Sequence, residues 1–226
     1  MISFESVSHS YGERVVLRGI TADLGEHRIG IIGGNGSGKS TLARLCNGLV
    51  RPTTGRVSVN GHDTVRDLKA VRATVGFVFQ DPDLQIIMPT VAEDLAFSLR
   101  KEHLPKSELA TRVDQYLEAY GLLDHRDHPA HLLSGGQKQL LAIAAVLITG
   151  PDIIIFDEPT TLLDLKNKRR IMDVVASLGQ QVIVVSHDLE FLSGFDRVLV
   201  LDQGRIAADD EPAAAIGAYR RLVLAE

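Results

Sequence analysis

The chain has 226 residues, of which 45% are hydrophobic and 23% charged, the balance of an ordinary globular protein. This length corresponds to one large domain or to a core with an inserted subdomain, and it buries enough surface to fold without disulfides or metals. The net charge of −5 argues against nucleic acid as the main partner, although a local basic site could hold phosphates.

Neither an export signal nor a membrane-spanning segment is expected. The longest apolar run, residues 140–148, is well short of the roughly 20 residues that cross a bilayer. The first ten residues carry neither a basic stretch nor an apolar one. The single cysteine, Cys46, excludes an internal disulfide and fits a reducing compartment. We therefore expect a soluble intracellular protein that would act at a membrane only as a peripheral subunit.

The N-terminal part of the chain alternates between short strands and turns. Strands are expected at residues 2–7, 15–17, 28–32 and 56–59. The third of these stops at a glycine pair, and the fourth leads into Asn60-Gly61, a strong hairpin signal. Between them, apolar residues at helical spacing predict a helix with Leu42, Leu45, Cys46 and Leu49 on one face.

From about residue 90 the hydrophobic period becomes helical. Thr90 and Glu93 fit a capping box at a helix start, and Gly121 is placed to end the next helix. Strand character returns at residues 153–156, 182–185 and 197–201, with helical segments between the strands. A last helix is expected around residues 213–224. The pattern predicts an α/β core, residues 1–81 and 151–226, interrupted by a helical subdomain at residues 82–150.

A glycine-rich loop follows the buried strand at residues 28–32. Residues 33–40 fit G-x-x-x-x-G-K-[ST], the Walker A pattern, and lie between a predicted strand and a predicted helix, which argues against a chance turn. Backbone amides of such a loop converge on phosphates, Lys39 adds a full charge, and the Ser40 hydroxyl can ligate Mg²⁺. The loop therefore predicts nucleoside triphosphate binding, with contacts from Gly33, Asn35, Gly36, Ser37, Gly38, Lys39, Ser40 and Thr41.

Two acids end the apolar strand at residues 153–156. A buried strand delivers its last side chains to the carboxyl edge of the sheet, where ligands of open α/β folds bind. We assign Asp157 to Mg²⁺ and Glu158 to the attacking water, from which it would take a proton. Taken alone, such a pair could equally be a solvated strand end. The phosphate loop upstream favours the catalytic interpretation.

A second helix start with an open glycine backbone lies at Leu133-Ser134-Gly135-Gly136-Gln137. Ser134 would cap the helix, and the free amides would form a second anion cradle. In isolation, a helix cap without a ligand is the simpler interpretation. One triphosphate per chain does not need two cradles in one place, but two chains packed head-to-tail could each complete the other's site.

The motifs GGNGSGKS, LSGGQ and IIIFDE, in this order and spacing, resemble those of the ATP-binding cassette (ABC) ATPases over nearly the whole chain. The resemblance implies a P-loop NTPase core with an N-terminal antiparallel β subdomain and an inserted helical subdomain. It also implies four further roles. Gln80 matches the Q-loop glutamine, which contacts Mg²⁺ and water, and His187 matches the switch histidine, which touches the γ-phosphate. Asp164 matches the D-loop aspartate at the dimer interface, and Tyr11 lies where an aromatic ring stacks on adenine. The D-loop reads Thr161-Leu162-Leu163-Asp164, with Leu where a small residue is common in the family.

Within that family, residues 79–86 and 90–97 are similar to the energy-coupling factor (ECF) importers of vitamins and metal ions. The resemblance implies a short extra helix carrying Gln85 that touches a transmembrane coupling protein. The short chain is most like the ATPase of the biotin transporter, and a cobalt or nickel ECF importer is the alternative. ATP and Mg²⁺ are implied as cofactors. The implied partners are a second copy, the coupling protein and a substrate-binding membrane subunit, with no nucleic acid, on the cytoplasmic face of the membrane.

Two other classes of function are weaker. Soluble ABC ATPases that act on DNA or ribosomes resemble paired cassettes or carry long coiled coils, whereas this chain has one cassette and no heptad stretch. A nucleotide-gated module without turnover conflicts with Glu158 and His187. Histidines at positions 125, 128 and 131 suggest a metal site, but Pro129 breaks any helix that would align them.

Overall fold

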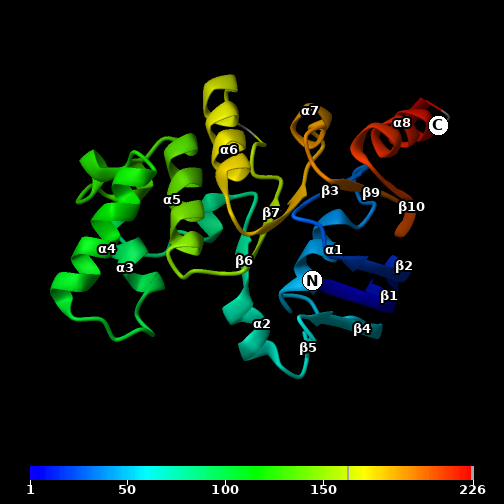
Figure 1. Cartoon of the computed structure of the whole chain (residues 1–226), viewed down its shortest axis with the longest axis horizontal. Coiled ribbons are helices and arrows are strands. Elements are labelled where there is room, and N and C mark those ends of the chain that lie inside the picture. The colour runs from blue at the N-terminus through cyan, green and yellow to red at the C-terminus, as the bar shows by residue number, and fades with distance from the viewer. Residues whose placement is uncertain (162, 225–226) are drawn as a thin grey trace. The chain divides into compact units, whose positions relative to one another are not determined.

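The computed structural model describes residues 1–161 and 163–224. It divides into two compact units, whose elements are labelled in Figure 1. The first comprises Met1–Phe77, Asp152–Glu158 and Leu178–Glu226, and the second Val78–Pro151 and Pro159–Ser177. Among the described residues, no helix has the length and apolar character needed to cross a membrane.

The first unit begins with a four-stranded antiparallel sheet. Its order is β2-β1-β4-β5, formed by Arg14–Leu24, Ile2–Tyr11, Thr54–Val59 and His62–Asp63. Apolar residues of β1 on one face are fully buried, among them Ile2, Phe4 and Val7. Tyr11 ends β1 and pairs directly with Arg14 at the start of β2, so the turn between them is short. This four-stranded sheet is the predicted N-terminal antiparallel β subdomain.

A six-stranded sheet forms the rest of the first unit, in the order β10-β9-β3-β8-β7-β6. These strands are Arg205–Asp210, Arg197–Asp202, Arg28–Gly33, Gln181–Val185, Ile153–Asp157 and Val75–Val78. Pairing from β9 through β3 and β8 to β7 is parallel, whereas β10 pairs antiparallel with β9. The central strands are buried apolar runs, as strands covered on both faces require. The carboxyl ends of β3, β7 and β8 therefore meet at one edge, which positions the site.

The helices of the first unit connect these strands. They are α1 (Lys39–Cys46), α2 (Leu68–Thr74), α7 (Leu189–Leu192) and α8 (Pro212–Leu224). The helix that follows the P-loop is shorter than its apolar pattern predicts. Helix α1 ends at Cys46, and Leu49 beyond it is 40% exposed. Gly48 adopts a left-handed φ of 66° just after the helix, which turns the chain away before Leu49 reaches the helix's buried face.

The second unit is helical and is drawn mostly in green and yellow in Figure 1. It contains the α-helices α3 (Val91–Ser98), α4 (Lys106–Ala119), α5 (Gly135–Leu147) and α6 (Leu165–Ser177). Three 3₁₀ turns connect them, η1 (Pro82–Leu84), η2 (Leu123–His125) and η3 (Ala130–Leu132). Helix α5 is the centre of this unit, because nine of its residues are buried. Both predicted capping boxes are present, Thr90 with Glu93 and Ser134 with Gln137.

The P-loop core, the antiparallel β subdomain and the inserted helical part confirm the predicted fold class. The boundaries of the units differ from residues 82–150, since residues 159–177 group with the helical unit. Long-range contacts account for this difference. The Arg170 guanidinium donates 2.7 Å to the Tyr120 carbonyl, joining α6 to the end of α4. The sequence showed only a helix between two strands, not what it packs against.

Gly136→Ala tests the packing of α5 against α6. A Cβ at position 136 would collide with the Asn167 side chain, whose amide donates 3.0 Å to Asp164. A Cβ at Gly135 would lie 3.9 Å from Leu163, an ordinary contact. We expect Gly136→Ala to lower the free energy of unfolding by about 1–2 kcal/mol, and Gly135→Ala to stay within about 1 kcal/mol of wild type. Urea unfolding measures both, and equal stabilities would contradict the packing role.

Candidate nucleotide-binding site

The P-loop joins the end of β3 to the start of α1. Lys39, the first residue of α1, is only 8% exposed, and its ammonium donates 2.8 Å to the Gly33 carbonyl and 2.9 Å to the Gly34 carbonyl. Burial lowers the pKa of Lys39, an effect that nearby Glu158 and Asp157 oppose. Neutral carbonyls are weak partners for a buried cation, so a phosphate oxygen would be a stronger one.

The loop's interior matches what a phosphate needs. Gly33 has a φ of 156°, and a side chain there would collide with the Leu201 carbonyl and the Ser37 hydroxyl. Ser37 is buried, and its hydroxyl has no hydrogen-bond partner in the part of the chain that the structure describes. An orphaned buried hydroxyl is costly unless a ligand satisfies it. This arrangement fits an anion seated in the loop, as predicted for a nucleoside triphosphate.

Asp157 ends β7 directly beside the P-loop helix. The carboxylate is 1% exposed and accepts a 2.7 Å hydrogen bond from the Ser40 hydroxyl, with the Arg44 guanidinium 3.3 Å from its other oxygen. Carboxylate and hydroxyl oxygens are ligands that Mg²⁺ prefers, so Ser40 and Asp157 fit the predicted metal role. Arg44 was not predicted, although it lies one helical turn after Ser40 and hence on the same face of α1.

Glu158 and His187 meet at the ends of β7 and β8. The Glu158 carboxylate lies 2.8 Å from His187 Nδ1, while the Glu158 amide donates to the Val185 carbonyl. Glu158 adopts a left-handed φ of 53°, a conformation that costs a residue with a side chain about 1–3 kcal/mol and that clusters at functional sites. The strained turn therefore places the Glu158 carboxylate against an exposed histidine.

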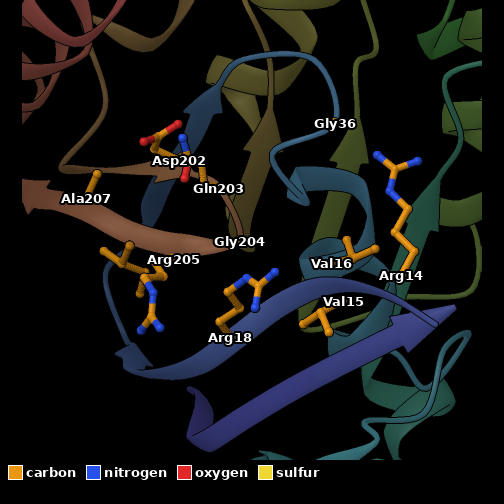
Figure 2. Close-up of a pocket in the computed structure, with 11 residues that line it drawn as sticks. Arg14, Val15, Val16, Arg18, Gly36, Asp202, Gln203, Gly204, Arg205 and Ala207 are labelled. Atoms are coloured by element: carbon orange, nitrogen blue, oxygen red, sulfur yellow. The ribbon is translucent and has the colours of Figure 1, made fainter.

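Tyr11, the residue predicted to stack on adenine, lies at the β1–β2 hairpin. Tyr11 is 50% exposed, and its ring lies at 82° to that of His9 with the ring centroids 4.5 Å apart. Arg14, opposite Tyr11 in the hairpin, reaches the P-loop, where a Cβ at Gly36 would be 3.4 Å from its guanidinium. Figure 2 shows Arg14 and Arg18 beside a pocket of about 600 Å³ that also borders Gly36 and Gly204. Sequence reasoning missed Arg14, although its place across from Tyr11 in a tight hairpin was a usable signal.

The remaining predicted site residues belong to the second unit. Ser134 and Gly135 are exposed at the start of α5, and Gln137 closes the capping box by accepting 2.9 Å from the Ser134 amide. Gly136 is buried against Asn167 of α6, and its predicted contact with a nucleotide stays a prediction. Gln80 is exposed after β6. Asp164 is exposed and accepts 2.8 Å from the Asn167 amide, which caps α6, while Leu162 of the D-loop lies outside the described residues.

The Gln85 expectation is wrong in one respect. The extra helix is a single 3₁₀ turn, Pro82–Leu84, and Gln85 follows it instead of lying on it. The Gln85 amide is used internally, because it accepts 3.2 Å from the Phe79 amide and donates 3.1 Å to the Ala142 carbonyl of α5. The exposed side chains of this segment are apolar: Leu84 is 72% exposed and Ile87 is 61% exposed.

The structure thus groups the predicted residues in two sets. The first unit brings together Lys39, Ser40, Asp157, Glu158 and His187, a set that can bind a triphosphate and activate water. The second unit carries Gln80, Ser134, Gly135, Gln137 and Asp164. Together with a P-loop between β3 and α1, the first set defines a P-loop nucleotide-binding protein.

Comparison with known proteins identifies the family. Residues 17–161 match the model of the ABC transporter family, so the chain belongs to that family and is an ABC-type ATPase. It is 51% identical over 221 residues to the biotin transport ATP-binding protein BioM of Rhizobium etli, covering 98% of each chain. It is 43% identical over 190 residues to the energy-coupling factor transporter ATP-binding protein EcfA1 of Caldanaerobacter subterraneus, covering 81% of this chain and 69% of the relative. The ATP-binding cassette MJ0796, solved as a dimer with ADP and phosphate, matches with a TM-score of 0.83 and 29% identity, covering 94% of this chain and 99% of the other.

These comparisons confirm the predicted fold and family resemblance, including its ECF character among the similar relatives. The roles of individual residues stay predictions, because the comparisons report similarity of whole chains. The structure adds Arg44 and Arg14 to the set of residues at the site.

Arg44→Met tests whether the Ser40–Asp157 pair holds a cation. We expect the free energy of unfolding to fall by about 1 kcal/mol, because a buried carboxylate loses a partner that is itself 41% exposed. Added MgCl₂ should raise the unfolding temperature more in this variant than in wild type, since the ion would replace the lost charge. Calorimetry with and without MgCl₂ measures this, with Arg44→Lys as the charge-preserving control. Identical Mg²⁺ responses in Arg44→Met and wild type would argue against the metal role.

Proposed function

We propose that the chain is the ATP-hydrolysing subunit of an ECF-type ABC importer for a vitamin, biotin. The observation that carries the hydrolytic part is the meeting of Glu158 and His187 beside the P-loop acid Asp157. A protein that only binds nucleotide would not require a glutamate in a strained backbone conformation with a histidine at its carboxylate. The importer and its substrate rest on the relatives named for biotin transport and for energy coupling.

Each residue of the first unit has a defined task in this proposal. Lys39 exchanges its two carbonyl partners for the β- and γ-phosphates, and the loop amides with the Ser37 hydroxyl hold the remaining oxygens. Tyr11 stacks on the adenine. Ser40 and Asp157, with Gln80, would hold Mg²⁺, which when bound neutralises charge on the phosphates. Glu158 takes the proton of the attacking water, and His187 leaves Glu158 to touch the γ-phosphate.

A head-to-tail homodimer would complete the site. The Ser134 amide is taken by the Gln137 side chain, which leaves the amides of Gly135 and Gly136 outside the capping box as an anion cradle for which one chain with one triphosphate has no second ligand. The exposed Asp164 would lie at the same interface. The dimeric state of the similar cassette with ADP and phosphate supports this arrangement. ATP would close the dimer, and hydrolysis would reopen it.

The membrane partners are a transmembrane coupling protein and a substrate-binding subunit, and the chain would act on the cytoplasmic face of the membrane. The exposed Leu84 and Ile87 beside the Gln80 loop are the surface we propose for the coupling protein, since exposed apolar side chains that lie together favour protein contact. Gln85 supports them from inside the fold.

Glu158→Gln is expected to keep ATP binding while hydrolysis falls by about 10²–10⁴, the worth of a positioned proton acceptor. The amide keeps the shape of the side chain but accepts no proton. Fluorescent-nucleotide titration and phosphate release measure the two effects. Lys39→Ala is the complementary variant and should lose triphosphate affinity itself. Glu190→Gln, an exposed acid on α7, is the matched control. Near-normal turnover of Glu158→Gln would refute the assigned role.

The substrate is tested by uptake. Cells lacking other biotin transporters and expressing the chain with its membrane partners should accumulate radiolabelled biotin, and Glu158→Gln should reduce this to the background of cells without the chain. Labelled cobalt and nickel are measured in parallel. Accumulation of a metal instead of biotin would establish the alternative importer, while the ATPase assignment would stand.

A further inference from the structure

A chain of hydrogen bonds leads from the signature loop to two of the histidines that the nucleotide site leaves unused. His125 Nε2 lies 2.7 Å from the Gln137 amide nitrogen, and His125 Nδ1 lies 2.9 Å from His128 Nδ1. All of these residues belong to the second unit. We infer that His125 is a positioning residue that holds Gln137, and through it the start of the signature helix α5, in the shape that receives a nucleotide.

The direction of each bond follows from the first one. The Ser134 amide can only donate, so the Gln137 atom 2.9 Å from it is the side-chain oxygen. The other Gln137 atom is then an NH₂ group, and it must donate to His125 Nε2. His125 Nε2 is therefore unprotonated. A neutral ring then carries its proton on Nδ1 and donates it to His128 Nδ1.

Gln137 consequently performs two tasks with one side chain. Its oxygen satisfies the Ser134 amide, while its own backbone amide donates 3.4 Å to the Ser134 hydroxyl, which completes the capping box. These bonds occupy the amides at positions 134 and 137 and leave those at 135 and 136 outside the box. The bond to His125 Nε2 satisfies the Gln137 NH₂ group and so favours the orientation in which the side-chain oxygen faces the Ser134 amide.

The other end of the chain is fixed as well. The His128 carbonyl accepts from the Val91 amide at 3.2 Å, and Pro129 bridges to Thr90, so both contacts tie His128 to the start of α3. The two histidine rings meet edge to face at 62°. The signature loop is thereby connected to α3 through three side chains, those of Gln137, His125 and His128, and through the His128 backbone.

The charged groups on the surrounding elements have other partners. On α4, Asp114 pairs with Arg126, which also pairs with Asp127. On α5, Lys138 pairs with Asp83, and on α3 Glu93 bonds Thr90. The remaining charged side chain of η2 is Asp124, which is exposed.

A metal explanation of these histidines is not supported by the described residues, where no group of three or more metal-ligating side chains occurs. His131 lies in η3, is exposed, and does not take part in this hydrogen-bond chain. It therefore provides a matched control of the same residue type, six positions away on the same stretch.

The arrangement needs a hydrogen-bond acceptor facing the Gln137 NH₂ group, because a donor at that place would force Gln137 to turn its oxygen to the ring and release the Ser134 amide. A glutamine at position 125 offers an acceptor oxygen at a similar reach. His125→Gln should therefore preserve the arrangement, whereas alanine offers no acceptor.

The test uses the full chain with its membrane partners. We expect His125→Ala to lower the turnover number about fivefold with KM for ATP nearly unchanged, the size of one lost neutral hydrogen bond. His125→Gln should restore turnover, and His131→Ala should match wild type. Unchanged turnover in His125→Ala, or no rescue by His125→Gln, would overturn the inference.

Because the inference rests on the proposed role of the signature loop, two further measurements separate their failures. Hydrogen exchange of the peptide containing Ser134 and Gln137, without nucleotide, should be faster in His125→Ala than in His125→Gln or His131→Ala. Equal exchange rates would overturn the positioning role whatever the function. Ser134→Arg should abolish hydrolysis. If it does not, the proposed function fails, whereas loss in Ser134→Arg with normal His125→Ala rejects the inference alone.

Discussion

The contact between Ser40 and Asp157 is the interaction on which the nucleotide site depends. It joins the first turn of α1 to the end of β7, and Arg44 one turn later supplies the charge that a carboxylate with 1% exposure requires. A buried carboxylate without such partners would protonate or leave the interior. The same contact brings two oxygen ligands into one place, so the folding requirement and the metal-binding requirement are met by the same atoms.

The site stores unfavourable features that a ligand can relieve. Lys39 is buried against two neutral carbonyls, the Ser37 hydroxyl is buried without a partner in the described chain, and Glu158 adopts a left-handed backbone. Each costs free energy, and a bound phosphate would compensate the first two. The surrounding sheet over-determines these positions, because β3, β7 and β8 are buried except at the first residues of β3 and β8 and pair in fixed parallel register.

Local signals explain what the sequence could predict. The P-loop, the acids after β7 and both capping boxes are each contained in eight or fewer neighbouring residues, and their chemistry requires particular residue types. Arg44 and the His125–Gln137 contact depend on side chains meeting after folding. Gln85 was misplaced for the same reason, since only the fold shows that its amide is used between Phe79 and Ala142. The grouping of α6 with the helical unit likewise depends on contacts of Arg170 and Asn167 that no hydrophobic period encodes.

The residues of the signature motif have different structural roles. Ser134 and Gln137 bond each other and shape the helix start, Gly136 is buried where α6 approaches, and Gly135 alone has both exposure and space. Only part of the motif is therefore free to face a ligand, and the rest holds that part in place. His125 extends the holding part beyond the motif, from a segment whose spacing of histidines suggested metal binding. Histidines whose spacing suggests metal binding can thus act through hydrogen bonds instead, when their partners fix which ring nitrogen carries the proton.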